Sequence, residues 1–327
     1  MSKVIGMGNA LVDVMTILKS DKTLVEFALP KGSMQLVTKE FSNSLLSGTL
    51  GLQKMQSSGG SAANTIHGLA NLGIESGFVG KIGKDNLGRF FEKDLKENKI
   101  KPILFHDLDE TGRSVAMISK DSERTMATFL GAADELHEED ITSDIFKGYQ
   151  FFHIEGYLVQ NRELIRKSMR LAKSNGLTVS IDMASFNVVQ DHRDFFETLI
   201  REYVDIVLAN ELEAESLTGA KHEKALEQIA EMAEIAVVKL GKKGSLVKRG
   251  SEEHTIGIEK VKSIDSTGAG DLYAAGFLYG LCMEQSLEIC GRVGAILGGQ
   301  ITKVIGAKMH EESWTTVKEK VSDVCCD

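Results

Sequence analysis

Residues 264–282 form the most informative segment of the chain, and they read Ile264-Asp-Ser-Thr-Gly-Ala-Gly-Asp271-Leu-Tyr-Ala-Ala-Gly-Phe-Leu-Tyr-Gly-Leu-Cys282. The second half has the small and apolar residues that are typical of a deeply buried helix. The first half is a turn of small residues in which Gly268 and Gly270 allow the backbone to turn tightly and approach a ligand. Since the free N–H groups at the start of a helix bind anions, this segment predicts a phosphate-binding turn.

Asp271 ends this turn and lies in the first turn of the expected helix. Its carboxylate would repel a bound phosphate, so we expect it to face a hydroxyl that attacks the phosphorus. In phosphoryl transfer an aspartate accepts the proton of the nucleophile. The alternative is an aspartate that only caps the helix, but the Gly-Ala-Gly run and a second glycine loop favour catalysis.

The second glycine loop reads Ser57-Ser-Gly-Gly-Ser-Ala-Ala-Asn64 and opens another expected helix. Gly59 and Gly60 again allow close approach of the backbone to a ligand. Asn64 would face the same crevice as Asp271, where an amide suits a sugar hydroxyl better than a phosphate. The alternative is a plain helix N-terminus with Ser61 as its cap.

The first expected strand is followed by polar side chains, in the order Gly6-Met-Gly-Asn9-Ala-Leu-Val-Asp13. Ligands of open α/β sheets bind beyond the carboxyl ends of the strands, so Asn9 and Asp13 are candidates to hold a diol. A solvated loop charge is the alternative for Asp13. A dinucleotide fingerprint is disfavoured because Leu11 replaces its third glycine, and no P-loop motif is present.

Apolar strand patterns alternate with amphipathic helix patterns along most of the chain, which predicts an α/β fold with a mainly parallel sheet and helices on both faces. Residues 16–37 and 103–130 break this rhythm. The second of these segments predicts a hairpin of Ser114–Ser119 and Thr125–Leu130, joined by Lys120–Arg124. We expect one domain over 1–327, with a small β lid from insertions at about 14–38 and 103–131; edge strands of the main sheet are the alternative.

The composition narrows the class of protein further. The chain has 38 basic and 47 acidic residues in 327, a net charge of −9, which disfavours nucleic acid or an anionic membrane as partner. No apolar run is long enough for a membrane helix, and the first residues do not resemble a signal peptide. Cys282, Cys290, Cys325 and Cys326 lack metal-ligand spacing, which is typical of a reduced cytoplasmic protein.

Four motifs, taken together, resemble the ribokinase-like or phosphofructokinase-B family of sugar and nucleoside kinases. They are Gly59–Asn64 with Gly83-Lys-Asp-Asn-Leu-Gly88, Asn210-Glu-Leu-Glu213, Leu240-Gly-Lys-Lys-Gly244 and Asp265–Asp271. With the first-strand motif the resemblance covers essentially the whole chain. It implies a three-layer αβα fold with a β lid, a primary hydroxymethyl acceptor, ATP and Mg²⁺ and, in some members, K⁺.

The resemblance also implies a role for each motif residue. Asp271 would be the base, and the N–H groups of Gly268, Ala269 and Gly270 would form the anion hole. The acceptor hydroxyls would contact the first two motifs, at Asn9, Asp13, Gly59, Gly60 and Asn64. The nucleotide and its Mg²⁺ would contact Asn210, Glu213, Lys239, Gly241 and Gly244, although the family often has a small hydroxyl residue where Lys239 stands. Asp265 and Thr267 resemble part of the monovalent-cation site.

Three shorter segments look more like the adenosine-kinase branch: Gly8–Asp13, Glu123–Met126 and Gly131–Asp134. In that branch a lid arginine can swing onto the phosphates, for which Arg124 is the candidate; a solvated turn charge is the alternative. Phe129 and Phe186 are candidates to stack on a base or to fill the core. The acceptor would be an adenosine-like nucleoside, a pentose or a hexose, and the protein a monomer or homodimer. A non-catalytic binding protein on the same fold and an NAD-dependent oxidoreductase are the rival functions.

Overall fold

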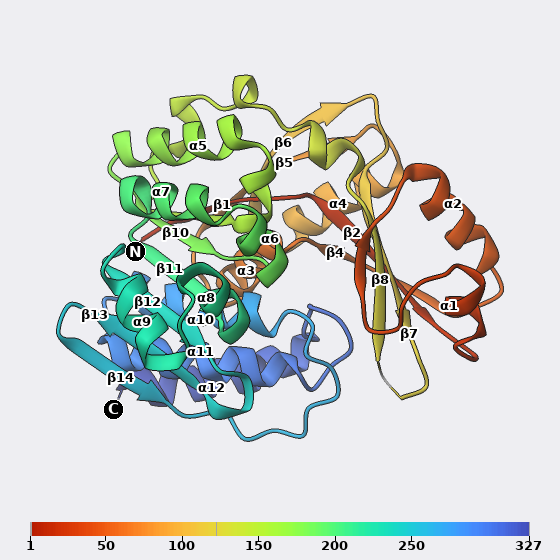
Figure 1. Cartoon of the computed structure of the whole chain (residues 1–327). Helices are drawn as coiled ribbons and strands as arrows, with labels where there is room; N and C mark the ends of the chain where they lie inside the picture. The colour runs from red at the N-terminus through yellow and green to blue at the C-terminus, as the bar shows by residue number, and fades with distance from the viewer. Residues whose placement is uncertain (1, 122, 327) are drawn as a thin grey trace.

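In the computed structural model, which describes residues 2–121 and 123–326, most of the chain surrounds a nine-stranded sheet with strand order β14-β13-β12-β11-β10-β9-β1-β5-β6 (Figure 1). The strands are β1 (Val4–Met7), β5 (Ser76–Gly83), β6 (Ile100–Asp107), β9 (Phe151–Glu155), β10 (Thr178–Asp182), β11 (Ile206–Asn210), β12 (Ile235–Lys239), β13 (Ser245–Arg249) and β14 (Glu252–Ile256). The strands from β12 to β6 are parallel, and β13 and β14 extend one edge antiparallel. The predicted mainly parallel sheet is therefore confirmed.

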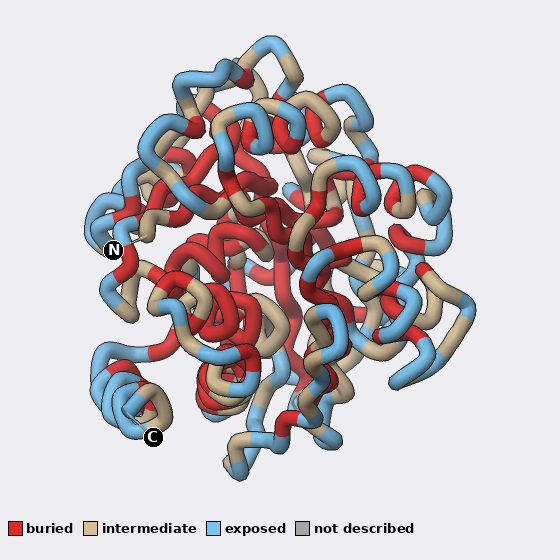
Figure 2. The backbone as a smooth tube through the Cα atoms, turned by 90° about the vertical axis from the view of Figure 1, so that its left-hand side faces the viewer, coloured by how far each residue is buried: buried red, intermediate tan, exposed pale blue. Residues whose placement is uncertain are grey.

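Helices cover both faces of this sheet, as the continuous apolar strands predict. One face packs against α3 (Ser61–Asn71), α4 (Asn86–Glu97), α10 (Ala269–Cys282), α11 (Leu287–Ile301) and α12 (Glu311–Cys326). The other packs against α5 (Arg162–Ser174), α6 (Phe186–Asp191), α7 (Arg193–Tyr203), α8 (Glu211–Thr218) and α9 (His222–Ala230). Successive strand residues such as Val4 and Ile5 enter opposite cores. Figure 2 shows buried strands inside and helices with exposed outer faces.

The short connections include 3₁₀ turns at η1 (Gly131–Glu135), η2 (Glu138–Asp140), η3 (Ser143–Phe146), η4 (Gly156–Gln160) and η5 (Gly241–Lys243). The first four lie in the connections to and from β9 and do not extend into longer helices. None of the helices in the described ranges is both long enough and apolar enough to span a bilayer.

A second, five-stranded sheet lies beside the large one, in the order β3-β8-β7-β2-β4 (Figure 1). Its strands are β2 (Leu11–Ile17), β3 (Met34–Leu36), β4 (Lys54–Gly59), β7 (Gly112–Ile118) and β8 (Arg124–Phe129). The short helices α1 (Lys22–Glu26) and α2 (Lys39–Gly48) pack on one face around Leu24 and Leu45. The predicted hairpin is β7–β8, and Ser122 in its turn lies outside the described residues.

The bounds of the second sheet differ from those expected for the lid segments. Residues 103–107 lie in β6 at the edge of the large sheet, whereas β4 and the first half of β2 come from outside the expected segments. The reason is that β6 carries Pro102 and is half exposed, so it lacks the apolar pattern of a central strand. The polar β4, Lys-Met-Gln-Ser-Ser-Gly, has no strand pattern either.

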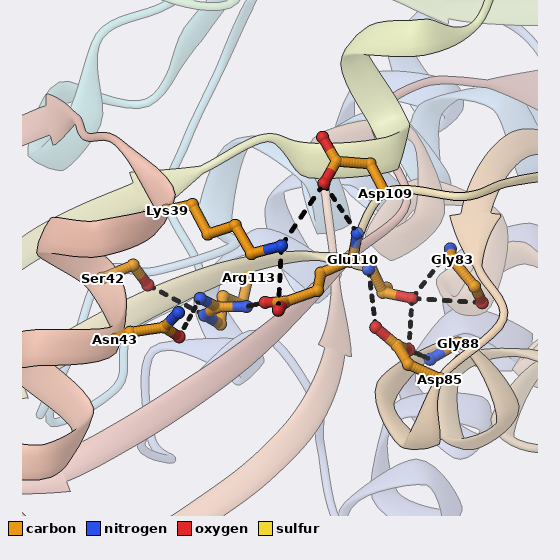
Figure 3. A network of polar contacts seen from close by, with 10 residues as sticks. Lys39, Ser42, Asn43, Gly83, Asp85, Gly88, Asp109, Glu110 and Arg113 are labelled. Carbon is orange, nitrogen blue, oxygen red and sulfur yellow. Dashed lines mark hydrogen bonds and ion pairs between the residues drawn. The ribbon is translucent and has the colours of Figure 1, made fainter.

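A polar network holds the crossing from the large sheet to the second sheet (Figure 3). Asp85 caps α4 by accepting from Gly88 N–H at 2.8 Å, and it also accepts from Thr111 N–H at 2.8 Å. Arg113, at the start of β7, donates to Glu110 at 2.8 Å and to Asn43 on α2 at 2.6 Å. The Gly83–Gly88 motif therefore lies at the joint between the two sheets.

Candidate active site

A cleft of about 1440 Å³ lies between the carboxyl ends of the large sheet's strands and the second sheet. Most of the predicted site residues line it: Asn9, Asp13, Gly60, Asn64, Asn210, Glu213, Lys239, Gly241, Gly244, Thr267, Ala269, Gly270 and Asp271. Gly59, Arg124, Asp265 and Gly268 do not line the cleft. Gly59 lies behind Asp13, Arg124 and Asp265 contact Thr267, and Gly268 precedes the lining residue Ala269. The topology thus brings loops distant in sequence to one edge of the sheet, as expected for an open α/β sheet.

Asp271 joins the two glycine loops across the cleft. Its Oδ1 accepts from Ser61 Oγ at 2.9 Å, and its Oδ2 accepts from Asn64 Nδ2 at 2.8 Å. Burial raises the pKa of Asp271 to about 6, and the nearby carboxylate of Asp182 adds to the shift. At neutral pH the carboxylate is ionised yet close to its pKa, as a general base requires.

The start of α3 is built differently from the expected Ser61 cap. The N-cap is Gly60, with φ +99°, and no side chain caps the helix. A Cβ at Gly60 would collide with the carbonyl oxygen of Asn9, so only glycine fits there. The Ser61 hydroxyl is therefore free to bind Asp271, and the capping alternative for Ser61 is wrong.

Asp13 lies on β2, within the second sheet, and is neither in a loop nor a solvated charge. Burial raises its pKa to about 6, against the opposing charges of Lys308 and Arg124. Gly59 pairs with Leu11 in the β2–β4 register, two residues away from Asp13, and a Cβ at Gly59 would lie 2.5 Å from Asp13 Oδ2. Gly59 therefore makes room for this carboxylate without lining the cleft.

Glu155, at the carboxyl end of β9, is a buried site residue that the sequence analysis missed. It accepts from Asn9 N–H at 2.9 Å, from Asn9 Nδ2 at 2.8 Å and from Ala62 N–H at 2.9 Å. Burial raises its pKa to about 7. Glu155 could have been predicted from its position, because it is a single glutamate at the end of an apolar strand. Asn9 was predicted on the same ground, since it follows the carboxyl end of the first strand.

Asp182, at the end of β10, is a second residue that was missed, and it is paired with Lys239. Lys239 Nζ donates to Asp182 Oδ2 at 2.6 Å, with 12 % and 8 % of the two side chains exposed. A Cβ at Gly270 would lie 3.2 Å from this Nζ, so the ammonium stands beside the first turn of α10. Lys239 therefore places its charge next to the predicted anion hole.

Asn210 and Glu213 form a capping box at the start of α8. Asn210 Oδ1 accepts from Glu213 N–H at 2.9 Å, and Glu213 accepts from Asn210 N–H at 2.7 Å. Burial beside Asp182 raises the pKa of Glu213 to about 7. The motif is thus first a helix start, and it presents both side chains to the cleft.

The turn after β12 has two glycines in the left-handed region, Gly241 with φ +57° and Gly244 with φ +94°. A Cβ at Gly244 would collide with the Ile256 carbonyl oxygen. Gly268, with φ +74°, is the N-cap of α10, and Leu272 N–H makes the first helical bond to its carbonyl at 2.8 Å. The N–H groups of this first turn have no partner within the helix, although Ala269 N–H donates to the Ser266 carbonyl of the preceding turn at 3.2 Å.

Arg124 does not reach the cleft; its guanidinium is bound behind the anion-hole turn. Its Nη2 lies 2.5 Å from Asp265 Oδ2, and its Nη1 donates to Thr267 Oγ1 at 2.8 Å. The side chain is 10 % exposed, so the alternative of a solvated turn charge is wrong. Of the two candidate aromatics, Phe186 lines the cleft, whereas Phe129 packs under Arg113.

The chain belongs to the pfkB family of carbohydrate kinases, whose family model matches residues 49–313. It is therefore an enzyme of the sugar and nucleoside kinase class, with the ribokinase-like fold. An adenosine kinase from Sinorhizobium meliloti has a crystal structure that covers 98 % of this chain and 99 % of its own, with 33 % identity and a TM-score of 0.89. A probable sugar kinase from Rhizobium etli covers 98 % of both chains, at 33 % identity and a TM-score of 0.90. A 5-dehydro-2-deoxygluconokinase of Listeria monocytogenes is 29 % identical over 72 % of this chain and 78 % of its own.

Proposed function

We propose that this enzyme transfers the γ-phosphoryl group of ATP to the primary hydroxymethyl group of an adenosine-like nucleoside, with Asp271 as the base. A pentose or hexose is the second candidate acceptor. The observation that carries the proposal is the Asp271 carboxylate, held by Ser61 and Asn64 on the first turn of α10 and ionised at neutral pH. It would accept the hydroxyl proton as the oxygen attacks the phosphorus.

The migrating phosphoryl group would bind to backbone N–H groups of Gly268, Ala269 and Gly270. Their place at the start of a long helix favours an anion because the N–H groups of the first turn and the helix dipole act together. The Ala269 N–H, which donates to the Ser266 carbonyl at 3.2 Å, would exchange that bond for one to the phosphoryl group. The Lys239 ammonium beside Gly270 adds a positive charge that a small hydroxyl residue would lack. Charge developing on the phosphoryl oxygens would therefore meet preorganised donors.

The carboxylates of the cleft suit a nucleotide that carries Mg²⁺. Asp182 and Glu213 are buried next to a single lysine, so oxygen donors exceed cations there. Among the described residues no group of three or more metal-ligating side chains is present. Mg²⁺ commonly binds through one or two carboxylates and the phosphates, where it neutralises phosphate charge. Asn210 and Glu213 would hold it through the phosphates, with Gly241 and Gly244 along the nucleotide.

The acceptor hydroxyls would bind to Asp13, Asn64, Gly60 and Asn9. In the part of the chain that the structure describes, Asn64 Oδ1 is buried without a hydrogen-bond partner. A buried acceptor of this kind is costly unless it is satisfied, so a ligand O–H is the fitting donor. The Asp13 carboxylate can accept from two neighbouring hydroxyls of the same ligand.

The wall that the second sheet presents to the cleft favours a nucleoside over a sugar acid. Leu11, Met34, Leu36, Met126 and Leu130 line it. The lysines among the described lining residues, Lys239 and Lys242, belong to the strand end and turn expected to hold the nucleotide. An acidic acceptor would therefore meet the Asp13 carboxylate, whose nearby cations Lys308 and Arg124 do not line the cleft, whereas a base gains from apolar contact.

A coupled assay of ATP consumption tests the proposal. The purified protein is offered adenosine, other nucleosides, ribose, fructose and the acid 5-dehydro-2-deoxygluconate, each with MgATP. We expect adenosine or a close analogue to give the highest kcat/KM and the acid to give none. ATP binding without acceptor-dependent ADP formation would instead support the non-catalytic alternative.

A further inference from the structure

The guanidinium of Arg124 occupies the place where the family resemblance leads one to expect a monovalent cation. Arg124 is the first residue of β8 in the second sheet, whereas Asp265 and Thr267 precede α10. The guanidinium lies 2.5 Å from Asp265 and donates to Thr267 at 2.8 Å. The two residues assigned to the cation are therefore both bound to one arginine.

The Asp265 carboxylate has no acceptor position left for an ion. Its Oδ1 accepts from Thr267 N–H at 3.1 Å and from Thr267 Oγ1 at 3.0 Å. Its Oδ2 accepts from Gly306 N–H at 2.8 Å and faces Arg124. A carboxylate offers about four lone-pair positions. Three of them accept hydrogen bonds, and the Arg124 guanidinium lies against Oδ2 as an ion pair, at the side where a cation would have to bind. The nearby Thr302 carbonyl accepts two N–H groups, those of Ile264 and Asp265.

Burial explains why a cation is needed at this point. The Asp265 side chain is 7 % exposed, and that of Arg124 is 10 % exposed. A buried carboxylate is stable only when it is paired and hydrogen-bonded. An arginine supplies this charge permanently, and it would repel a second cation at the same carboxylate.

We propose that Arg124 replaces the monovalent cation, so that this enzyme binds no K⁺ at Asp265. The positive charge behind the anion-hole turn then comes from an arginine of the second sheet, whereas in the alternative it comes from an ion bound from solution. Displacing the second sheet from the turn would leave Asp265 without its counter-charge, whereas a bound ion would stay with the turn. The proposal concerns the site that the proposed function uses, but it can be tested without catalysis.

The test is thermal unfolding in the chlorides of K⁺, Na⁺ and tetramethylammonium at equal ionic strength. For the wild type we expect the same midpoint in all three. Arg124→Ala should lower the midpoint in Na⁺, and K⁺ should restore at least about 2 °C of it, a shift that corresponds to about 1.4 kcal/mol in a chain of this size. A K⁺-specific stabilisation of the wild type would overturn the proposal.

Two further variants keep the test decisive if Arg124→Ala does not fold. Arg124→Lys retains a charge and Arg124→Gln retains only polar contact, so the glutamine variant should be the less stable and the one that responds to K⁺. Equal stability of the two, or no K⁺ response in any uncharged variant, would contradict the proposal. Arg113→Ala, which removes another buried arginine of the second sheet from its own carboxylate partner Glu110 (Figure 3), should lose stability equally in K⁺ and Na⁺.

Discussion

Asp271 illustrates at the scale of one residue how the cleft combines opposing requirements. Burial raises its pKa, while hydrogen bonds from Ser61 and Asn64 lower it, and the balance is a pKa of about 6. A free aspartate would be a weaker base, and a fully desolvated one would be protonated at neutral pH. The two glycine loops are thus needed together, because α3 supplies the donors and α10 the carboxylate.

At Lys239 this chain differs from the pattern expected of the family, which often has a small hydroxyl residue at that position. Lys239→Met should lower kcat and raise KM for ATP, since the ammonium beside Gly270 is lost. It also leaves the buried Asp182 without its partner, which typically costs about 3–5 kcal/mol of the free energy of unfolding. Steady-state kinetics and urea unfolding measure both effects.

Lys242→Met is the matched control, because it removes an exposed lysine of the same turn. We expect little loss of stability from it. If the two variants unfold at the same urea concentration, the ion pair between Lys239 and Asp182 does not have the role described here.

Single residues also show what sequence reasoning could and could not find. Asp271, Asn64 and Asp13 were predicted because each lies in a motif with glycines around it. Glu155 and Asp182 were missed because each is one acidic residue at the end of an apolar strand. Their importance comes from register, since β9 and β10 pair Glu155 with Asp182 and no local pattern records that pairing.

Among the helices, α3 starts at a residue with an unusual backbone conformation, the left-handed Gly60. Gly60→Ala combines a left-handed φ with a collision against the Asn9 carbonyl oxygen. We expect it to lose more stability than left-handed strain alone, which costs about 1–3 kcal/mol, and to weaken acceptor binding. Urea unfolding and acceptor KM are the measurements.

Gly73→Ala provides the control for this variant. Gly73 also has a left-handed φ, +93°, but a Cβ there meets nothing within 4 Å. Its loss of stability therefore measures strain alone, and acceptor binding should be unchanged. An equal loss in the two variants would show that the approach of Asn9 to Gly60 is unimportant.

The strands of the large sheet that the sequence patterns predicted are those covered by helices on both faces. The central strands β1, β9, β10, β11 and β12 read as apolar runs, and all of them lie inside the large sheet. Edge strands could not be found in this way, because most positions of β4, β6 and β14 are exposed or half-buried and carry no continuous apolar run. The second sheet was expected as a lid, but its strands β2 and β4 are defined only by pairing across the chain.

Buried titratable groups make the stability of the whole molecule depend on pH. The folded-state pKa values of Glu155 and Glu213 are raised from 4.5 to about 7, so the native state retains protons that the unfolded chain releases. The stability that these two groups contribute is therefore lost as the pH rises through about 7, and the unfolding midpoint should rise as the pH falls from about 7.5 to about 6.5.

Lys308, whose pKa burial lowers to about 8, opposes this trend at higher pH, because the unfolded chain then binds more protons at this lysine than the native state does. As the pH falls further, Asp13 and Asp271, whose pKa values are raised to about 6, add to the gain, while His153 and His67, whose pKa values are lowered by burial, oppose it.

Thermal unfolding of the ligand-free protein against pH measures this trend, with Glu155→Gln as the comparison. The variant should have a shallower slope above pH 6.5, whatever its absolute midpoint. Activity should run the other way, because Asp271 must be ionised, so kcat/KM falls as the pH drops through about 6. A midpoint that rises steadily from about pH 6.5 to about pH 7.5 would contradict the linkage.

The most direct test of the proposed chemistry is acceptor-dependent ATP consumption by Asp271→Asn. Asparagine keeps the size of the side chain but cannot accept the hydroxyl proton, and positioned general bases contribute about 10²–10⁴-fold to rate. We predict that kcat falls by at least about 100-fold while calorimetric binding of ATP and acceptor changes little. Turnover close to that of the wild type, with binding intact, would contradict the role of Asp271 as the base.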